Sequence, residues 1–193
     1  MERVLLTGAG GQLGSELQKT APENIELLAV GRDELDISVS QLVDSTISQF
    51  KPTTVINAAA FTAVDKAEES YKEAERINAL APCYLAELCR KSGTLLIHIS
   101  TDFVFDGFGK TPYKPDSKTS PLGSYGQTKL DGEKKIQEEL STALIIRTSW
   151  VYSTYGKNFV KTMLRLMEER DIVQVVEDQI GSPTWARGLA KML

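Results

Sequence analysis

The sequence predicts an α/β protein with a Rossmann-like, doubly wound parallel sheet. Short apolar runs alternate with amphipathic stretches along all 193 residues, which is the pattern of repeated strand and helix units. The first of these apolar runs leads directly into a glycine-rich turn that opens a helical pattern. No repeat, low-complexity tract or linker divides the chain, so we expect one domain over residues 1–193.

Each element follows from its local pattern. The segments predicted to be strands are residues 4–7, 26–30, 54–58, 95–100, 143–148 and 173–176. Helical patterns lie between them at residues 12–19, 39–50, 70–91, 125–139 and 158–169. Pro82 should divide the long third helical segment into two helices or kink it, because an interior proline removes a backbone donor. Residues 106–121 combine glycines and prolines without an apolar period, which predicts a long loop.

The composition excludes several classes of protein. A hydrophobic fraction of 41% and a net charge of -4 fit a globular chain and offer no broad cationic surface, so we expect no nucleic-acid or membrane partner. The N-terminus lacks the pattern of a signal peptide, and we expect a cytoplasmic protein. Cys83 and Cys89 form no CxxC motif, so we expect reduced helix residues and no metal site.

The motif TGAGGQLG at residues 7–14 has the context of a dinucleotide-binding turn. Residues without a Cβ atom let the backbone approach a pyrophosphate, whose charge meets free N–H groups at the helix N-terminus. The alternative is a plain strand-to-helix turn. Under the first interpretation the cofactor contacts come from Gly8, Gly10, Gly11, Gln12, Leu13 and Gly14.

The second strand ends at Arg32 and Asp33, where such proteins read the adenosine ribose. Arg32 favours the 2′-phosphate of NADPH, whereas Asp33 suits the free hydroxyl of NADH, so both cofactors stay open. Asp36 and Ile37 could bracket the adenine. For Asp36 an equally good interpretation is a cap for the helix that starts near Ser38.

Tyr125 and Lys129 are four residues apart on a predicted helix and therefore share one face. A tyrosine pKa of about 10 requires a nearby positive charge before the phenol can act as an acid near neutrality, and Lys129 could supply it. Thr101, favoured over Ser100, ends a strand at the carboxyl edge of the sheet and could hold a substrate oxygen. The single histidine, His98, is expected to be a packed residue rather than a base.

With these residues, the chain resembles the extended short-chain dehydrogenase/reductase superfamily, which has TGxxGxxG and YxxxK motifs. It resembles more closely the dTDP-4-dehydrorhamnose reductase family. The segments that carry this second resemblance are NAAAFTAVDKAE at residues 57–68, STDFVFDG at 100–107, RTSWVY at 147–152 and DQIGSPT at 178–184.

The resemblance implies reduction of the C4 ketone of dTDP-4-dehydro-L-rhamnose by NADPH or NADH, a step in making an activated sugar for surface polysaccharide. It implies that Tyr125 protonates the alkoxide, that Lys129 holds the nicotinamide ribose and lowers the Tyr125 pKa, and that Thr101 assists. The further contacts it implies are Ala59, Ala60 and Phe61 with the cofactor, and Val64, Thr101, Asp102, Tyr125 and Trp150 with the nucleotide sugar.

The chain also departs from the family. Pro115 and Ser117 stand where relatives tend to carry acids, so loop contacts do not transfer. The stretch from Asn158 to Leu193 is expected to lead towards a C-terminal substrate-binding segment that is largely absent. Two alternatives stay open: a nucleotide-sugar epimerase or dehydratase of the same superfamily, and a non-catalytic NADP-binding regulatory subunit of methionine adenosyltransferase. A homodimer is an open expectation.

Overall fold

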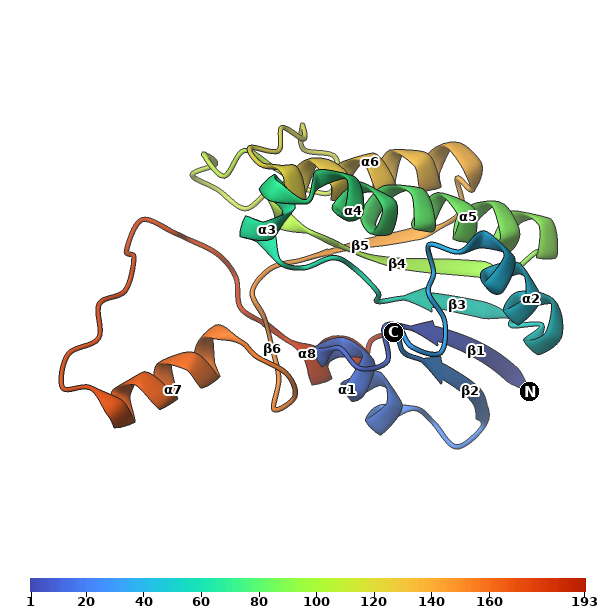
Figure 1. Cartoon of the computed structure of the whole chain (residues 1–193), viewed down its shortest axis with the longest axis horizontal. Helices are drawn as coiled ribbons and strands as arrows, with labels where there is room; N and C mark the ends of the chain where they lie inside the picture. The colour runs from blue at the N-terminus through green and yellow to red at the C-terminus, as the bar shows by residue number, and fades with distance from the viewer.

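The computed structural model describes residues 1–193 and has a five-stranded parallel sheet between two layers of helices (Figure 1). The strands are β1 (Glu2–Thr7), β2 (Ile25–Val30), β3 (Thr54–Asn57), β4 (Leu95–Thr101) and β5 (Leu144–Thr148). Their order in the sheet is β2-β1-β3-β4-β5. The chain therefore starts inside the sheet and winds first to one side and then to the other, which confirms the predicted doubly wound α/β fold.

The two faces of the sheet carry separate cores. On one face Leu5, Val55 and Leu96 pack against α2 (Ser40–Phe50), α5 (Ala81–Ser92) and α6 (Ser124–Glu139). On the other face Leu6 and Ile97 pack against α1 (Gln12–Thr20) and α8 (Ala186–Ala190). Successive side chains of a strand point to opposite faces, so a continuous apolar run such as residues 4–6 supplies both cores.

One row of the sheet is polar instead of apolar. The parallel register pairs Thr7 of β1 with Asn57 of β3, and Asn57 with His98 of β4. All three side chains are buried. Buried polar groups must find partners within the protein, so this row makes hydrogen bonds across the strands near the carboxyl edge of the sheet.

The long helical segment is divided near Pro82, as the sequence predicts. It follows α3 (Val64–Glu69) and consists of α4 (Tyr71–Glu75), the π-helical turn η1 (Arg76–Leu80) and α5. Pro82 lies in the first turn of α5, where a missing backbone N–H costs little. Both cysteines are free and lie on α5.

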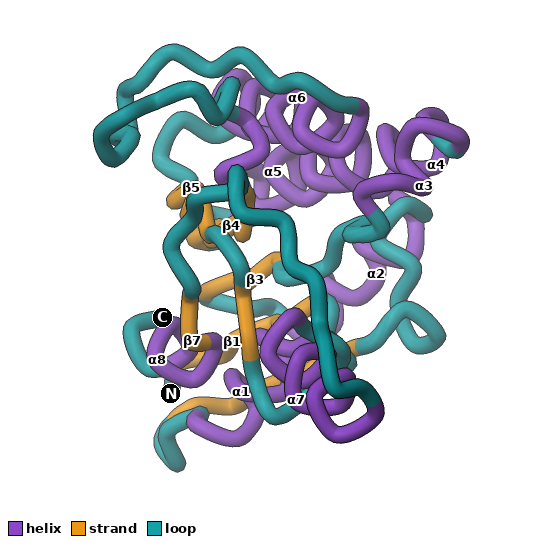
Figure 2. The backbone as a smooth tube through the Cα atoms, turned by 90° about the vertical axis from the view of Figure 1, so that its left-hand side faces the viewer, coloured by secondary structure: helices purple, strands orange, loops and turns teal.

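The C-terminal part of the chain lies beyond the carboxyl edge, onto which Figure 2 looks. Two short strands, β6 (Val151–Tyr152) and β7 (Thr184–Trp185), pair in parallel, and α7 (Phe159–Glu169) has no buried residue. The predicted strand at residues 173–176 is wrong, because this apolar run has no neighbouring strand to pair with and lies in an exposed connection. Residues 106–121 form the predicted loop without helix or strand.

Helix α6 packs against its neighbours through glycines. A Cβ atom at Gly132 would collide with the backbone carbonyl oxygen of Asn78 in η1. A side chain there would push α6 away from η1 and from the sheet.

We therefore expect Gly132→Ala to destabilise the fold by about 1 kcal/mol or more, because overpacking outweighs the helix propensity that alanine adds. The matched control is Glu138→Ala, at an exposed position of the same helix, which should change stability by less than about 0.5 kcal/mol. Urea unfolding monitored by circular dichroism measures both. A Gly132→Ala protein as stable as the control would mean that the close approach carries no energetic weight.

Candidate functional site

Parallel strands bring the ends of β1, β3 and β4 to one edge of the sheet (Figure 2), and segments that carry predicted site residues follow these ends. The strand order reverses between β1 and β3, the position at which open α/β sheets bind ligands. The glycine turn follows β1, the NAAAFT segment follows β3, and Thr101 ends β4.

The glycine turn has the geometry of a phosphate cradle. Gly8 has φ of 77°, and a Cβ there would lie 2.6 Å from the carbonyl carbon of Ala58. A Cβ at Gly14 would lie 2.8 Å from the Cα of Ala9, whereas one at Gly10 would meet nothing within 4 Å. No side chain caps α1, so its first N–H groups are free to meet an anion.

The side chains of Gln12 and Leu13 make structural contacts within the protein. Leu13 is 7% exposed and packs in the core beneath the turn. Gln12 donates to the carbonyl oxygen of Val151 at 3.2 Å and accepts from Asn158 at 2.9 Å, which ties α1 to β6 and to the start of α7. Any contact of these two residues with a cofactor would therefore come from the backbone.

Two arginines gather at the end of β2. Arg32 is exposed and its guanidinium lies 3.3 Å from Glu73, which also pairs with Arg76 at 2.8 Å.

Asp36 accepts from the Ser38 backbone N–H at 2.9 Å, and the hydrogen bond from the Ser38 side chain lowers the Asp36 pKa. Asp36 therefore makes a local turn with Ser38 and does not cap α2, whose N-cap is Val39 without a side-chain hydrogen bond. Ile37, 5% exposed, packs in the core and not on the surface.

The segment after β3 is clamped by a residue that the sequence analysis missed. Asn78 of η1 is completely buried, accepts from the backbone N–H of Phe61 at 2.9 Å and donates to its carbonyl oxygen at 3.1 Å. Ala59 and Ala60 precede Phe61 and are partly exposed at the same edge. The sequence did contain a signal for this role, because Asn78 is a polar residue within an otherwise apolar helical stretch.

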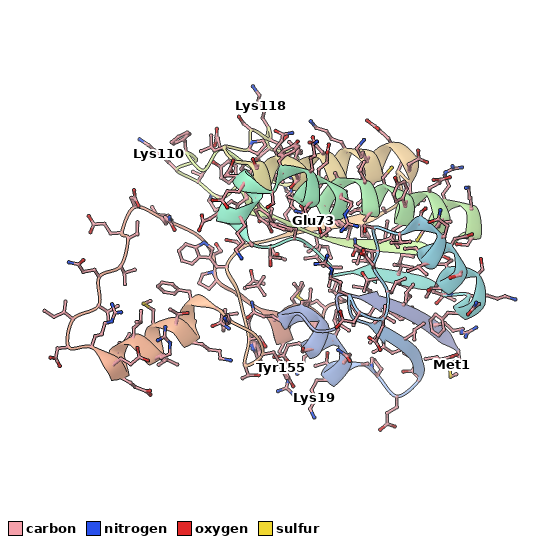
Figure 3. All side chains as sticks on the ribbon, in the orientation of Figure 1. Met1, Lys19, Glu73, Lys110, Lys118 and Tyr155 are labelled. Atoms are coloured by element: carbon pink, nitrogen blue, oxygen red, sulfur yellow. The ribbon has the colours of Figure 1, made fainter.

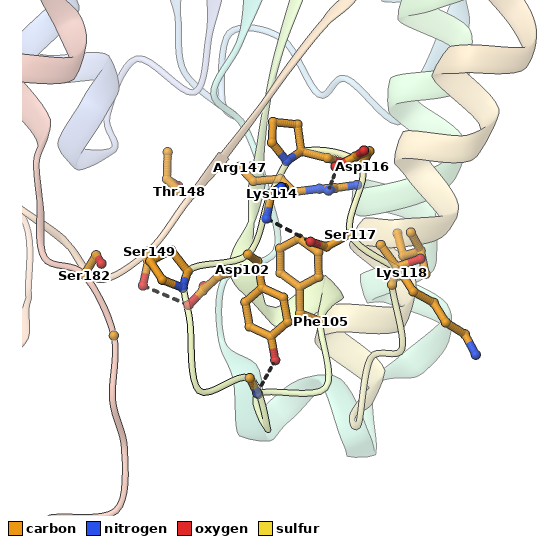
Figure 4. Close-up of a pocket in the computed structure, with 18 of the residues that line it drawn as sticks. Asp102, Phe105, Lys114, Asp116, Ser117, Lys118, Arg147, Thr148, Ser149 and Ser182 are labelled. Atoms are coloured by element: carbon orange, nitrogen blue, oxygen red, sulfur yellow. Dashed lines mark hydrogen bonds between the residues drawn. The ribbon is translucent and has the colours of Figure 1, made fainter.

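Tyr125, Thr101 and Asp102 converge at the end of β4. The Phe103 ring lies edge-on to Tyr125, with centroids 5.5 Å apart. Burial raises the pKa of the Tyr125 phenol and the Asp102 carboxylate raises it further, while a hydrogen bond with the Thr101 side chain lowers it. The Asp102 carboxylate accepts from Ser149 at 2.8 Å (Figure 4). The predicted phenol and hydroxyl pair is therefore assembled.

The Lys129 amine contacts the sheet in this structure, and its expected action on Tyr125 stays a prediction. Its Nζ donates to the carbonyl oxygen of Ile99 at 2.7 Å and lies 3.2 Å from Nε2 of His98. It is therefore directed into the sheet, and no influence of its charge on the Tyr125 pKa is resolved. Burial lowers the pKa of the Lys129 amine to about 8, against a smaller opposing effect of Glu133. Tyr125 and Lys129 lie on the same helix, α6, as the sequence predicts, and the amine contacts Ile99 and His98.

Trp150 and Val64 stand at the outer rim of this edge. Trp150 is 44% exposed and has φ of 48°, a strained value for a residue with a Cβ. Its indole covers Gly181, where a Cβ would lie 2.6 Å from the ring. Val64 opens α3 and is 36% exposed. Both side chains are accessible to a ligand.

A cavity of about 1250 Å³ borders this site and includes neither Tyr125 nor the glycine turn. It lies between residues 105–119, α6 and the end of β5 (Figure 4). Arg147 spans it: the guanidinium binds Glu133 at 2.6 Å, donates to the carbonyl oxygen of Pro115 at 3.0 Å and lies 5.0 Å from the Phe105 ring. Glu133 also accepts from Ser100.

A family model described as the RmlD substrate binding domain matches residues 1–193. The chain is 46% identical to the dTDP-4-dehydrorhamnose reductase of Aggregatibacter actinomycetemcomitans and covers 66% of that protein, which in turn matches 100% of this chain. It is 42% identical to the enzyme of the same name from Burkholderia thailandensis, with coverage of 97% of this chain and 63% of the relative.

A solved structure of dTDP-4-dehydrorhamnose reductase from Bacillus anthracis in complex with NADP is similar with a TM-score of 0.96 and 40% identity. The match covers 99% of this chain and 68% of that one. The chain thus spans about two thirds of the length of the proteins that it matches. The glycine turn and the ends of β3 and β4 lie within the matched part.

Because Glu133 is 5% exposed and Arg147 is its partner, we expect Arg147→Met to lower stability by about 2 to 4 kcal/mol, mostly from the buried carboxylate left unpaired. Adding Glu133→Gln should restore part of this loss, since an amide needs no cation. The exposed pair of Arg165 and Glu169 gives the control: Arg165→Met should cost less than about 1 kcal/mol. Additive effects in a double-mutant cycle of unfolding free energies would contradict the coupling.

Proposed function

The chain belongs to the RmlD substrate binding domain family, and on this basis we propose that it reduces the C4 ketone of dTDP-4-dehydro-L-rhamnose to dTDP-L-rhamnose. The observation that carries the proposal is the meeting of the glycine turn with Tyr125 and Thr101 at the switch point of the sheet. We further propose that the reaction takes place in the cytoplasm.

The cradle fits a dinucleotide phosphate. Gly8 and Gly14 leave room that a Cβ would fill, and α1 begins without a side-chain cap. NADPH, when bound, would supply the hydride. Gly8, Gly11 and the first turn of α1 would hold its pyrophosphate, and the Ala59 to Phe61 segment, fixed by Asn78, would border it.

The chain's own residues would then donate the proton to the substrate. Tyr125 would be the general acid, since its phenol holds a proton at neutral pH. Burial raises the Tyr125 pKa, and the hydrogen bond with Thr101, which lowers it, offsets part of that rise. Thr101 would hold the ketone oxygen beside the phenol. Asp102, oriented by Ser149, and the exposed Trp150 would contact the sugar. An oxyanion formed at C4 would take the phenolic proton directly.

We expect Tyr125→Phe to lower kcat by about 10² to 10⁴, the usual contribution of general acid catalysis, while the Kd for NADPH changes little. The measurement is oxidation of NADPH with dTDP-4-dehydrorhamnose, followed by absorbance, with cofactor binding followed by fluorescence. Tyr155→Phe is the control, since Tyr155 is exposed in the connection between β6 and α7 (Figure 3). Retained turnover in Tyr125→Phe would refute the assigned role. Tightly bound NAD without net consumption would favour an epimerase or dehydratase.

Arg32 generates a second prediction. It is exposed and stands with Arg76 where a 2′-phosphate would lie. Arg32→Ala should weaken NADPH binding by about tenfold to a hundredfold, the value of one charge-assisted hydrogen bond, and weaken NADH binding far less. Arg90→Ala removes the same charge from an exposed pair between α5 and α6 and serves as control. Equal losses for both cofactors would show that Arg32 does not read the phosphate.

A further inference from the structure

A buried row of polar side chains connects the glycine-turn end of β1 to Lys129. Thr7, Asn57 and His98 are register neighbours on β1, β3 and β4, and Lys129 packs over His98 from α6. Their exposures are 1%, 0%, 0% and 1%. Because these side chains are shielded from bulk solvent, their hydrogens should face acceptors within the row.

The direction of the hydrogen bonds follows from Asn57. Its Oδ1 accepts from the Thr7 hydroxyl at 2.7 Å and from the backbone N–H of Ala59 at 3.2 Å. A backbone N–H can only donate, so the amide oxygen must lie on that side. The Asn57 Nδ2 group therefore faces Nδ1 of His98, at 3.0 Å, and donates to it.

The protonation of His98 and Lys129 follows in turn. A His98 ring that accepts at Nδ1 is neutral and carries its proton on Nε2. Nε2 lies 3.2 Å from Lys129 Nζ, which also donates to the carbonyl oxygen of Ile99. An ammonium has three donors and no acceptor, so it would face the Nε2–H group unfavourably. An uncharged amine accepts that hydrogen and still donates to Ile99.

We propose that Thr7, Asn57 and His98 are positioning residues. Thr7 and Asn57 hold His98 as its Nε2–H tautomer, and His98 in this form lowers the affinity of Lys129 for its proton. Two other charged groups lie nearby. Glu133 acts on Lys129 from the same helix and opposes the effect, but its carboxylate is bound by Arg147 of β5. We call the hydrogen-bonded row from Thr7 through Asn57 and His98 to Lys129 the relay. Burial lowers the pKa values of both Lys129 and His98, and for Lys129 this is the same direction as the effect of the relay.

One consequence rests on the proposed function. If Lys129 must be a cation for Tyr125 to act as an acid, reduction should fall as pH rises through the Lys129 pKa of about 8. A lysine with the ordinary pKa of about 10.4 would support activity well above that pH. The relay would thus set the alkaline limit of the pH profile.

The test is nuclear magnetic resonance on the 193-residue chain, in which His98 is the single histidine. With ¹⁵N-histidine, we expect one imidazole that carries its proton on Nε2 at about pH 8 to 9, above the ordinary histidine pKa. With ¹³C-lysine, one amine should titrate near 8. A proton on Nδ1, or no lysine titrating below about pH 9.5, would overturn the proposal without any variant.

Asn57→Asp reverses the relay, because a carboxylate oxygen accepts from Nδ1–H and leaves Nε2 free to accept from the Lys129 ammonium. We expect the His98 proton to move to Nδ1 and the Lys129 midpoint to rise by at least about one pH unit, tenfold in proton affinity. Thr54→Val, a buried change at the opposite end of β3, should alter neither. An unchanged Lys129 midpoint in folded Asn57→Asp would refute the relay.

These spectra separate the relay from the proposed function. The tautomer and the lysine midpoint need no substrate and no turnover. A chain that shows the expected spectra but reduces no keto sugar would keep the relay and lose the proposed function. If reduction occurs, its alkaline limit should move upward with Asn57→Asp in parallel with the lysine midpoint.

Discussion

The site depends on how closely α6 approaches the backbone around it. Gly126 and Gly132 have no Cβ, and a Cβ at either would collide with the carbonyl oxygen of Phe103 or of Asn78. Glycine inside a helix costs about 1 kcal/mol relative to alanine, so the contact must return at least that much in packing. The approach places Tyr125 at the end of β4 and lets Lys129 reach a carbonyl within the sheet.

The sequence predicted the parts of this arrangement that are local. The glycine turn, the five strands of the parallel sheet and the shared helix face of Tyr125 and Lys129 each follow from spacing within a few residues. The short elements α3, α8, β6 and β7 carry too few residues to show a period. The apolar run at residues 173–176 has strand composition but no partner, and pairing is a tertiary property.

The direction of the Lys129 amine could not be predicted for the same reason. Helical spacing indicates which residues are neighbours on a face, but not whether an ammonium turns towards a phenol or into a sheet. That choice depends on the Ile99 carbonyl oxygen and on His98, which lie about thirty residues away in sequence. Asn57 and Asn78 were missed likewise, since their partners are set by strand register and by the π-helical turn.

Burial raises the pKa of Tyr125 and lowers that of Lys129, which lie four residues apart on α6. Burial favours the neutral form of each group: the phenol that still has a proton to give, and the amine that can accept one. An acid needs its proton before the transfer and a nearby cation once the phenolate forms. A lysine whose pKa is about 8 can change its charge near neutral pH, whereas an exposed lysine would remain a cation there. The burial that holds α6 against the sheet therefore also sets the chemistry at its N-terminal end.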